Sequence, residues 1–216
     1  MAVRRSFVHD ELVAAGAMFA PVADAEIARS FGDETGERAA VRSLALADLS
    51  PLPRWGAKGR DTMAWAAEAG LVLGEAPNVA YRQPSGLLIA KLAASEVVML
   101  PDLSGPKDAP LPSGDGRLCF PVPRRESSLW FRLLGSRTPE MLAKLCGIDF
   151  RADRFADLAI AQTSIARMNG VLIRDDHGAT PAFHLLADSA SASFLWRSLL
   201  DAMDEYRGRI VGTAAL

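Results

Sequence analysis

Residues 101–116, PDLSGPKDAPLPSGDG, divide the chain into two parts. This stretch is rich in Pro, Gly, Ser and Asp, which interrupt helices and strands, so it predicts a surface loop or a boundary between subdomains. Strand and helix patterns recur on both sides of it. We therefore predict an N-terminal extension at 1–38, a first α+β unit at 39–104, a loop or junction at 105–125, and a second α+β unit at 126–216.

The first unit carries one helix pattern among strand patterns. Residues 40–47 alternate with a period of two, which predicts a strand. Apolar residues recur at helical spacing over 60–69, and Gly70 follows as a helix-ending glycine. Two apolar runs, 87–92 and 96–100, predict the strands of a hairpin. The predicted order is strand, helix, strand, strand (βαββ).

The second unit repeats this order. Its predicted strands are 129–134, 159–167, 171–174 and 182–186. Thr138 and Pro139 are typical of a helix start, and this helix is predicted to run to residue 146. Asn169-Gly170 is a strong signal for a type I′ hairpin turn.

A last helix is predicted to begin at Asp188 or Ser189. Leu195, Leu199 and Met203 form one apolar stripe along it, so one face packs on a sheet. The fold class that follows is α+β, with two tandem ferredoxin-like βαββ units whose helices lie on one side of each sheet. Residues 1–38 are predicted to add one short helix that lies on another surface.

The 216 residues carry a formal net charge of −2, with 24 basic and 26 acidic side chains well interspersed. We therefore expect no nucleic-acid partner. The longest apolar runs, 86–90 and 97–100, are too short to span a bilayer, and no signal-peptide core follows the N-terminus. We therefore expect no membrane segment. Cys119 and Cys146 form no metal or redox motif, so we expect two free thiols in a reducing, cytoplasmic location and no metal site. Because half of the residues are apolar, some apolar surface is expected to face a partner.

Residues 46–59, LADLSPLPRWGAKG, allow two roles. Glycines beside Lys58 could cradle an anion, but the spacing matches neither G-x-x-x-x-G-K-[ST] nor G-x-G-x-x-G. We favour a tight corner between a strand and a helix, with Gly56 and Gly59 at positive φ. An exposed Trp55 flanked by Arg54 and Lys58 would suit contact with another protein, so these three are the candidate partner-interface residues.

Two blocks of the sequence resemble a known family. Asp-Leu-Ser at 48–50 and Gly-x-Asp at 59–61 resemble the first folate-domain block of the glycine-cleavage aminomethyltransferases. The ordered C-terminal set, CGIDFRADRFADLAIAQTSIARMNGVLIRDD and then FHLLADSASASFLWRSLLDAMDEYRG, resembles the gamma subunit of heterotetrameric sarcosine oxidase. Together the blocks cover about residues 40–212.

The resemblance implies aminomethyltransferase folate-domain-like units and a cytoplasmic complex of four different chains. That complex oxidises the N-methyl group of sarcosine, passes electrons between flavins to oxygen and transfers the one-carbon unit to tetrahydrofolate. The alpha, beta and delta subunits are the implied partners, and they would hold FAD, FMN, NAD and tetrahydrofolate. The gamma subunit would hold no cofactor of its own.

One stretch departs from the aminomethyltransferase pattern. The resemblance places acidic residues at the end of a glycine-rich strand, where one assists proton movement beside the folate. Residues 76–95 contain no Asp or Glu, and Ile89, Ala90 and Lys91 stand where the acids are expected. Aliphatic side chains cannot act as a general base, which argues against independent aminomethyl transfer.

No other residues form a convincing catalytic or metal-binding set. His9 lies in the extension, His177 in an Asp-Asp-His-Gly turn and His184 on a predicted strand, and each is more typical of surface or core. Asp175 and Asp176 could join His177 on a metal, but this sequence is foremost a polar turn. We therefore assign no catalytic, cofactor-binding or metal-binding residue to this chain.

Three hypotheses for function remain. The first is a non-catalytic gamma subunit of a sarcosine oxidase complex, which oxidatively demethylates sarcosine to glycine. The alternative is a self-sufficient tetrahydrofolate-dependent one-carbon enzyme of the aminomethyltransferase type. The third is a free-standing binding module with a degenerate folate-domain fold.

Overall fold

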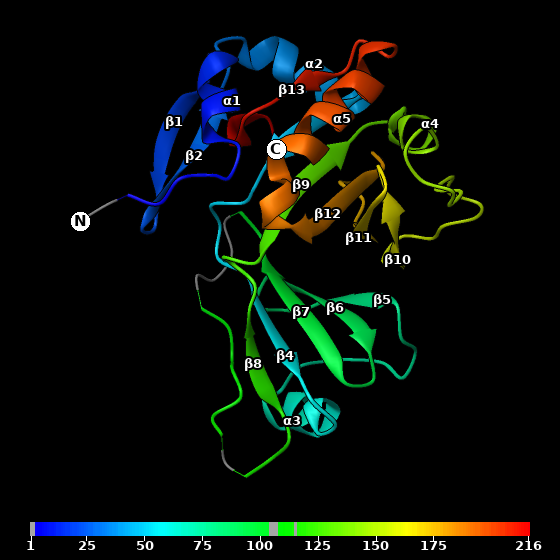
Figure 1. Cartoon of the computed structure of the whole chain (residues 1–216). Coiled ribbons are helices and arrows are strands. Elements are labelled where there is room, and N and C mark those ends of the chain that lie inside the picture. The colour runs from blue at the N-terminus through cyan, green and yellow to red at the C-terminus, as the bar shows by residue number, and fades with distance from the viewer. Residues whose placement is uncertain (1–2, 104–107, 115) are drawn as a thin grey trace.

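The computed structural model describes residues 3–103, 108–114 and 116–216. They form two main sheets and a separate two-stranded hairpin (Figure 1). Each main sheet contains the order strand, helix, strand, strand, so the predicted α+β class with two tandem βαββ-like units is confirmed. In the described part of the chain, none of the helices has the length and apolar character that a bilayer span requires.

The six-stranded sheet has α4 and α5 on one face (Figure 1). Its strands, in spatial order, are β10 (Ile160–Ile165), β11 (Met168–Arg174), β12 (Ala182–Asp188), β9 (Ser128–Leu134), β3 (Ala45–Asp48) and β13 (Arg209–Ile210). The predicted stripe of α5 (Ala192–Asp204) is buried, and its Trp196 packs edge-on against Phe131 of β9 with ring centroids 5.1 Å apart. α4 (Thr138–Leu142) is shorter than the predicted helix, and Arg137 rather than Thr138 is its N-cap residue.

The five-stranded sheet is covered by α3 (Thr62–Glu68). Its strands, in spatial order, are β5 (Val79–Arg82), β6 (Leu87–Ala93), β7 (Glu96–Pro101), β4 (Trp55–Lys58) and β8 (Phe120–Pro123). The predicted hairpin is confirmed as β6 and β7. Trp65 of α3 packs against Ile89 and Met99, so this sheet has its own small core.

The two sheets also share a core. Trp130 and Leu186 of the larger sheet pack with Leu88 and Leu100 of the smaller one. Backbone hydrogen bonds connect the sheet edges: Ile160 donates to the carbonyl of Asn78 at 2.9 Å, and Ala80 donates to the carbonyl of Leu158 at 2.7 Å. The sheets are therefore fixed relative to each other by both packing and hydrogen bonds.

The N-terminal segment is not an extension, which corrects the prediction for residues 1–38. It contains α1 (His9–Ala14), β1 (Met18–Val22) and β2 (Ala25–Ser30). Val8 and Leu12 are completely or almost completely buried in the core of the larger sheet. Because burial of such side chains stabilises the fold, this segment is an integral part of it.

The predicted strand at 40–47 is half helix. α2 (Glu34–Ser43) begins after Asp33, whose carboxylate accepts a hydrogen bond from the Gly36 amide at 2.9 Å. Only β3 remains of the predicted strand, and it pairs with β9 of the larger sheet. The boundary predicted at residue 39 therefore cuts a helix, and β3 belongs with the strands of the second unit.

The segment 55–58 is β4 rather than a turn, because both of its edges are paired, with β7 and β8. Of the two glycines predicted at positive φ, only Gly59 has it, at +146°. A Cβ there would lie 1.9 Å from the carbonyl oxygen of Leu118, so only glycine fits. β8 lies within the predicted junction at 105–125, which is therefore partly strand.

Asn169-Gly170 does not form the turn between β10 and β11. Both residues lie inside β11, and the turn falls at Ala166 and Arg167, with φ of 46° and 66°. Positive φ at both central positions is the mark of a type I′ turn, so the predicted turn type occurs three residues earlier. A short 3₁₀ turn, η1 (Ser189–Ser191), precedes α5 in place of the first turn of the predicted helix.

Candidate functional site

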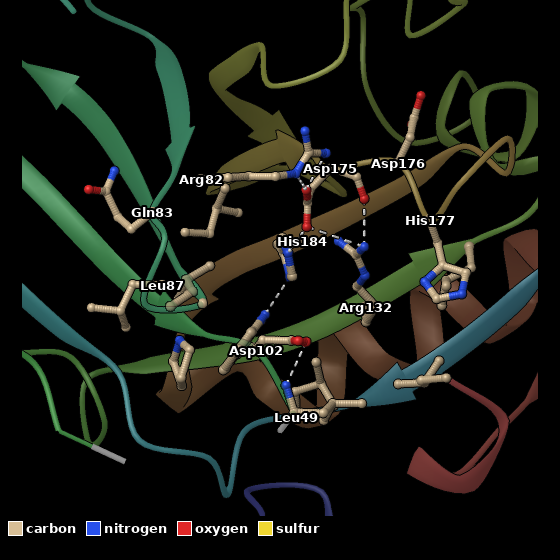
Figure 2. A pocket seen from close by; sticks show the side chains of 18 residues that line it. Leu49, Arg82, Gln83, Leu87, Asp102, Arg132, Asp175, Asp176, His177 and His184 are labelled. Carbon is tan, nitrogen blue, oxygen red and sulfur yellow. Dashed lines mark hydrogen bonds and ion pairs between the residues drawn. The ribbon is translucent and has the colours of Figure 1, made fainter. Parts of the chain in front are cut away.

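A cavity of about 340 Å³ lies between the two sheets. The turn between β5 and β6 and the end of β7 form one side of it, and β9 and β12 form the other (Figure 2). Residues 175–177, which follow β11, close a third side. This is the size range of small-molecule sites, and both polar and apolar side chains line it.

A chain of hydrogen bonds crosses the cavity wall. The indole Nε1 of Trp130 donates to Nδ1 of His184 at 2.9 Å, and Nε2 of His184 lies 3.1 Å from Oδ2 of Asp175. Because an indole can only donate, Nδ1 is an acceptor, and the proton of the neutral imidazole lies on Nε2 and is donated to Asp175. Burial, together with the nearby charge of Arg132, lowers the pKa of His184 to about 4. His184 is therefore neutral at pH 7.

Asp175 is the acceptor on which the polar groups of the cavity converge (Figure 2). Its Oδ1 lies 2.7 Å from Nη2 of Arg82, and its Oδ2 lies 3.5 Å from Nη2 of Arg132. Burial alone raises the pKa of this carboxyl, but the hydrogen bond from His184 and the two guanidinium groups outweigh that effect and hold its pKa well below the usual range. Asp175 is thus a buried, compensated anion.

Arg132 lies at the centre of β9 and is almost fully buried. Its Nη2 donates to the backbone carbonyl of Asp175 at 2.6 Å. Its Nη1 is buried and has no hydrogen-bond partner among the described residues. Burial lowers the pKa of Arg132 to about 10, which still leaves the guanidinium charged at pH 7.

The Asp-Leu-Ser segment at 48–50 is hydrogen-bonded to β9, which forms one side of the cavity. Trp130 donates its backbone N–H to Oγ of Ser50 at 3.0 Å, and Leu49 donates its own to the carbonyl of Trp130 at 2.8 Å. The carboxylate of Asp48 accepts from the Ser50 amide at 3.1 Å, and burial raises its pKa. This motif therefore fixes Trp130 and places Leu49 at the cavity.

His184, the buried histidine of the cavity, is poorly suited to proton transfer. A general base needs a nitrogen or oxygen that can reach a substrate proton, and both nitrogens of His184 are already hydrogen-bonded. The two cysteines contact threonines, at Thr62 and Thr163, rather than a histidine. Among the residues that the structure describes, no three His, Cys, Asp or Glu side chains gather as a metal site.

The three positions expected to carry catalytic acids, residues 89–91, are all buried. Ile89 is buried beneath α3, and Ala90 is buried in the core that the sheets share. Lys91 is buried as well, and its ammonium donates to the carbonyls of Gly74 at 2.8 Å and Glu75 at 2.7 Å. None of the three lines the cavity.

Arg54 is not an exposed interface residue, because its side chain is buried. Nη1 donates to the carbonyls of Ser50 at 2.7 Å and Leu52 at 3.0 Å, and Nη2 donates to those of Arg125 and Ser128. Burial lowers the pKa of Arg54 to about 10. The guanidinium therefore connects the segment before β4 to the start of β9.

Trp55 and Lys58 lie at the two ends of β4. Trp55 is half-buried against the small core of the five-stranded sheet. Lys58 is exposed, and its Nζ lies 2.7 Å from Oε2 of Glu96. The three predicted interface residues thus differ in environment, and of these only Lys58 has a mostly exposed side chain. Their contact with a partner stays a prediction.

Two histidines lie where the sequence placed them, with His184 on β12 and His177 in a turn. His9, which was predicted to lie in an extension, is instead the first residue of α1. The turn at 175–177 does more than the sequence suggested, because Asp175 and Asp176 bind arginines that line or adjoin the cavity. Sequence reasoning missed Arg132 as a cavity residue. The available signal was an arginine in the middle of the apolar strand LWFRLL, which is unusual unless the charge has a partner.

Comparison of the whole chain with solved structures gives two informative likenesses. Glycine cleavage system aminomethyltransferase T from Bartonella henselae is 14% identical with a TM-score of 0.73, over 99% of this chain and 61% of that one. The chain has the aminomethyltransferase-like fold. Heterotetrameric sarcosine oxidase from Corynebacterium sp. U-96, in complex with pyrrole 2-carboxylate, is 17% identical with a TM-score of 0.64, over 84% of this aminomethyltransferase-like chain and 97% of that one.

The sequence itself matches no protein-family model and no curated protein. At identities of 14% and 17%, the likenesses establish the fold of this aminomethyltransferase-like chain and not its activity. The chain spans about three fifths of the aminomethyltransferase it resembles.

Proposed function

We propose that this chain is the non-catalytic gamma subunit of a heterotetrameric sarcosine oxidase. The complex oxidatively demethylates sarcosine to glycine in the cytoplasm. The alpha, beta and delta subunits bind FAD, FMN, NAD and tetrahydrofolate. This chain contributes structure and contact surface, and no reacting group.

The burial of residues 89 and 90 carries the proposal. An aminomethyltransferase needs an acid that can move a proton beside its folate, and the corresponding positions here hold Ile89 and Ala90, each completely buried in an apolar core. A carboxylate at either position would lose its hydration without gaining a partner, which is strongly unfavourable. The core is thus built for hydrocarbon at these positions, and not for a proton acceptor.

The two structural likenesses differ in how much of the neighbouring chain they span. This chain accounts for 97% of the sarcosine oxidase chain but for only 61% of the aminomethyltransferase. The fold described here therefore corresponds to nearly all of that sarcosine oxidase chain, which supports the proposed subunit role.

A surface at the edge of the five-stranded sheet is suited to such assembly. Phe120 of β8 is 54% exposed and pairs directly with Lys58 of β4. Aromatic side chains such as Phe are enriched in protein interfaces. We place a partner subunit against this edge.

Co-expression with flavoprotein subunits of the same organism tests the proposal. We expect a tagged copy of this chain to elute with them as one complex and to show flavin absorption, whereas the chain purified alone has none. A Phe120→Asp/Lys58→Glu variant should fold but recover less than a tenth of the flavin. Elution of the wild-type chain without flavoprotein would contradict the proposal, and tetrahydrofolate binding by the isolated chain would favour the independent enzyme instead.

A further inference from the structure

The cavity between the sheets contains one buried donor without an acceptor. The side chain of Arg132 is only 9% exposed, and its Nη1 makes no hydrogen bond within the described residues. Its Nη2, in contrast, is bonded to the carbonyl of Asp175. A buried donor that stays unpaired is unfavourable, and a charged one more so, so an acceptor that reached Nη1 from the cavity that Arg132 lines would be favourable.

The charge of Arg132 is only partly compensated by its neighbours. Asp175 is the one described carboxylate within ion-pair distance of it, at 3.5 Å. The same carboxylate is shared with Arg82 at 2.7 Å and with His184 at 3.1 Å. Asp176 is held by two hydrogen bonds from Arg174. Asp102 at the rim adds negative potential, but a direct acceptor on Nη1 is lacking.

Leucine side chains form the apolar part of the lining. Leu49, Leu88, Leu100 and Leu134 are buried, and Leu103 is half-buried at the rim. A ligand that hydrogen-bonds to Arg132 and also packs on the leucines therefore has an acidic or strongly accepting end and an aliphatic body. The volume of about 340 Å³ limits it to a small molecule.

We propose that this cavity binds a small aliphatic carboxylate, whose oxygen accepts from Nη1 of Arg132 and whose hydrocarbon lies on the leucines. The proposal goes beyond the subunit role, because it gives this chain a ligand of its own. No bond is made or broken in the cavity. Binding to the isolated chain is tested without any partner, so its failure would leave the subunit role untouched.

Calorimetric titration of the full chain with three matched probes tests the proposal. We expect 4-methylpentanoate to bind and acetate, which lacks the body, to bind at least tenfold more weakly. The neutral 4-methylpentanamide should also bind at least tenfold more weakly than the acid, because a charged acceptor binds a guanidinium more strongly than a neutral one does. Equal binding of acid and amide, or no binding of the acid, would overturn the proposal.

Two variants locate the site. Arg132→Lys keeps the charge but changes the donor geometry, and we expect at least a tenfold weaker affinity for 4-methylpentanoate. Since this buried residue also supports the fold, Leu103→Glu is the second variant, which places a repelling charge on the half-buried rim. Leu118→Glu, at an exposed leucine outside the cavity, is its control and should keep wild-type affinity. Loss of binding in the control, or its retention in both cavity variants, would contradict the assignment.

Discussion

At residue 184 a histidine accepts from an indole and donates to a carboxylate, and this arrangement couples its titration to folding. The pKa of the imidazole falls from 6.5, the ordinary value for histidine, to about 4 in the folded protein, chiefly because burial disfavours the charged form. Below pH 6.5 the unfolded chain therefore binds a proton that the folded chain does not. Neutral His184 makes its full contribution to the free energy of unfolding above pH 6.5, and this contribution is lost as the pH falls toward 4.

We predict that the free energy of unfolding falls by about 3 kcal/mol between pH 6.5 and pH 4 through His184 alone, at 1.36 kcal/mol per pKa unit. Denaturant titrations of the wild type and His184→Gln at several pH values measure this. The difference between the two proteins should shrink steadily as the pH is lowered. His177→Gln, at an exposed position, should keep the wild-type slope. Parallel curves for the wild type and His184→Gln would refute the assigned protonation state.

Arg54 and Lys58 are close in sequence but opposite in environment. Arg54→Met removes donors from four backbone carbonyls in a buried site, so we expect it to lower the free energy of unfolding by about 3 kcal/mol. Lys58→Met removes one exposed ion pair and should cost less than about 0.5 kcal/mol. Thermal and denaturant unfolding compare them, and a cost below about 1 kcal/mol for Arg54→Met would show that the guanidinium is not holding these segments together.

Residue types alone could not distinguish these two cations. Arg54, Trp55 and Lys58 read as one exposed group because they follow two prolines and flank a glycine. Which of them is buried depends on where β9 passes, and its Ser128 lies 74 residues from Arg54 in the sequence. The same holds for the cavity, because Arg132 and Asp175 meet only when β9 and β12 are paired.

At the scale of elements, the hairpin between β10 and β11 shows how a strong local signal can be overruled. Asn169-Gly170 suits a type I′ turn, yet the turn lies at Ala166 and Arg167, neither of which favours positive φ. A Cβ at position 170 would lie 2.9 Å from Cγ2 of Ile165, so the glycine serves close packing within the strand. Register is set by which face is buried, and that requirement outweighs the turn preference.

Arg167→Gly should therefore stabilise the protein by about 1 kcal/mol, because glycine adopts positive φ without strain. Asn169→Gly in the same hairpin should destabilise it by about 0.5–1 kcal/mol, since this exposed residue lies in regular strand. Melting temperatures of the two variants measure both effects. If Asn169→Gly were the stabilising change, the turn would be at the position that the sequence favoured.

Elements with long, one-sided patterns could be predicted, and short ones could not. The β6–β7 hairpin and the stripe of α5 follow from periodicity alone. The sequence predicts a strand at residues 40–43, where the structure has a helix, because period two and period 3.6 are hard to separate in eight residues. The N-terminal hairpin of β1 and β2 has weak alternation, and its place in the fold depends on contacts with distant segments such as η2 (Thr213–Ala215).

At the scale of the whole molecule, the fold resembles that of an aminomethyltransferase, whereas the residues at the expected catalytic positions do not. The aminomethyltransferase-like fold is kept over the whole chain at 14% identity. In the cavity between the sheets, both ring nitrogens of His184 are hydrogen-bonded, and Asp175 and Asp176 are bound by arginines. The aminomethyltransferase-like fold with hydrocarbon at residues 89 and 90 is the basis of the assembly role proposed above.

The central claim is that this chain performs no one-carbon chemistry by itself, and activity of the purified chain tests it most directly. The chain alone, free of flavoproteins, is incubated with sarcosine and tetrahydrofolate in the presence of oxygen as the two-electron acceptor, and the products glycine, methylenetetrahydrofolate and hydrogen peroxide are measured. We predict no product above the level of a heat-denatured control, and product formation only when the other three subunits are added. Turnover by the isolated chain that tracks the protein through a further purification step would contradict the account.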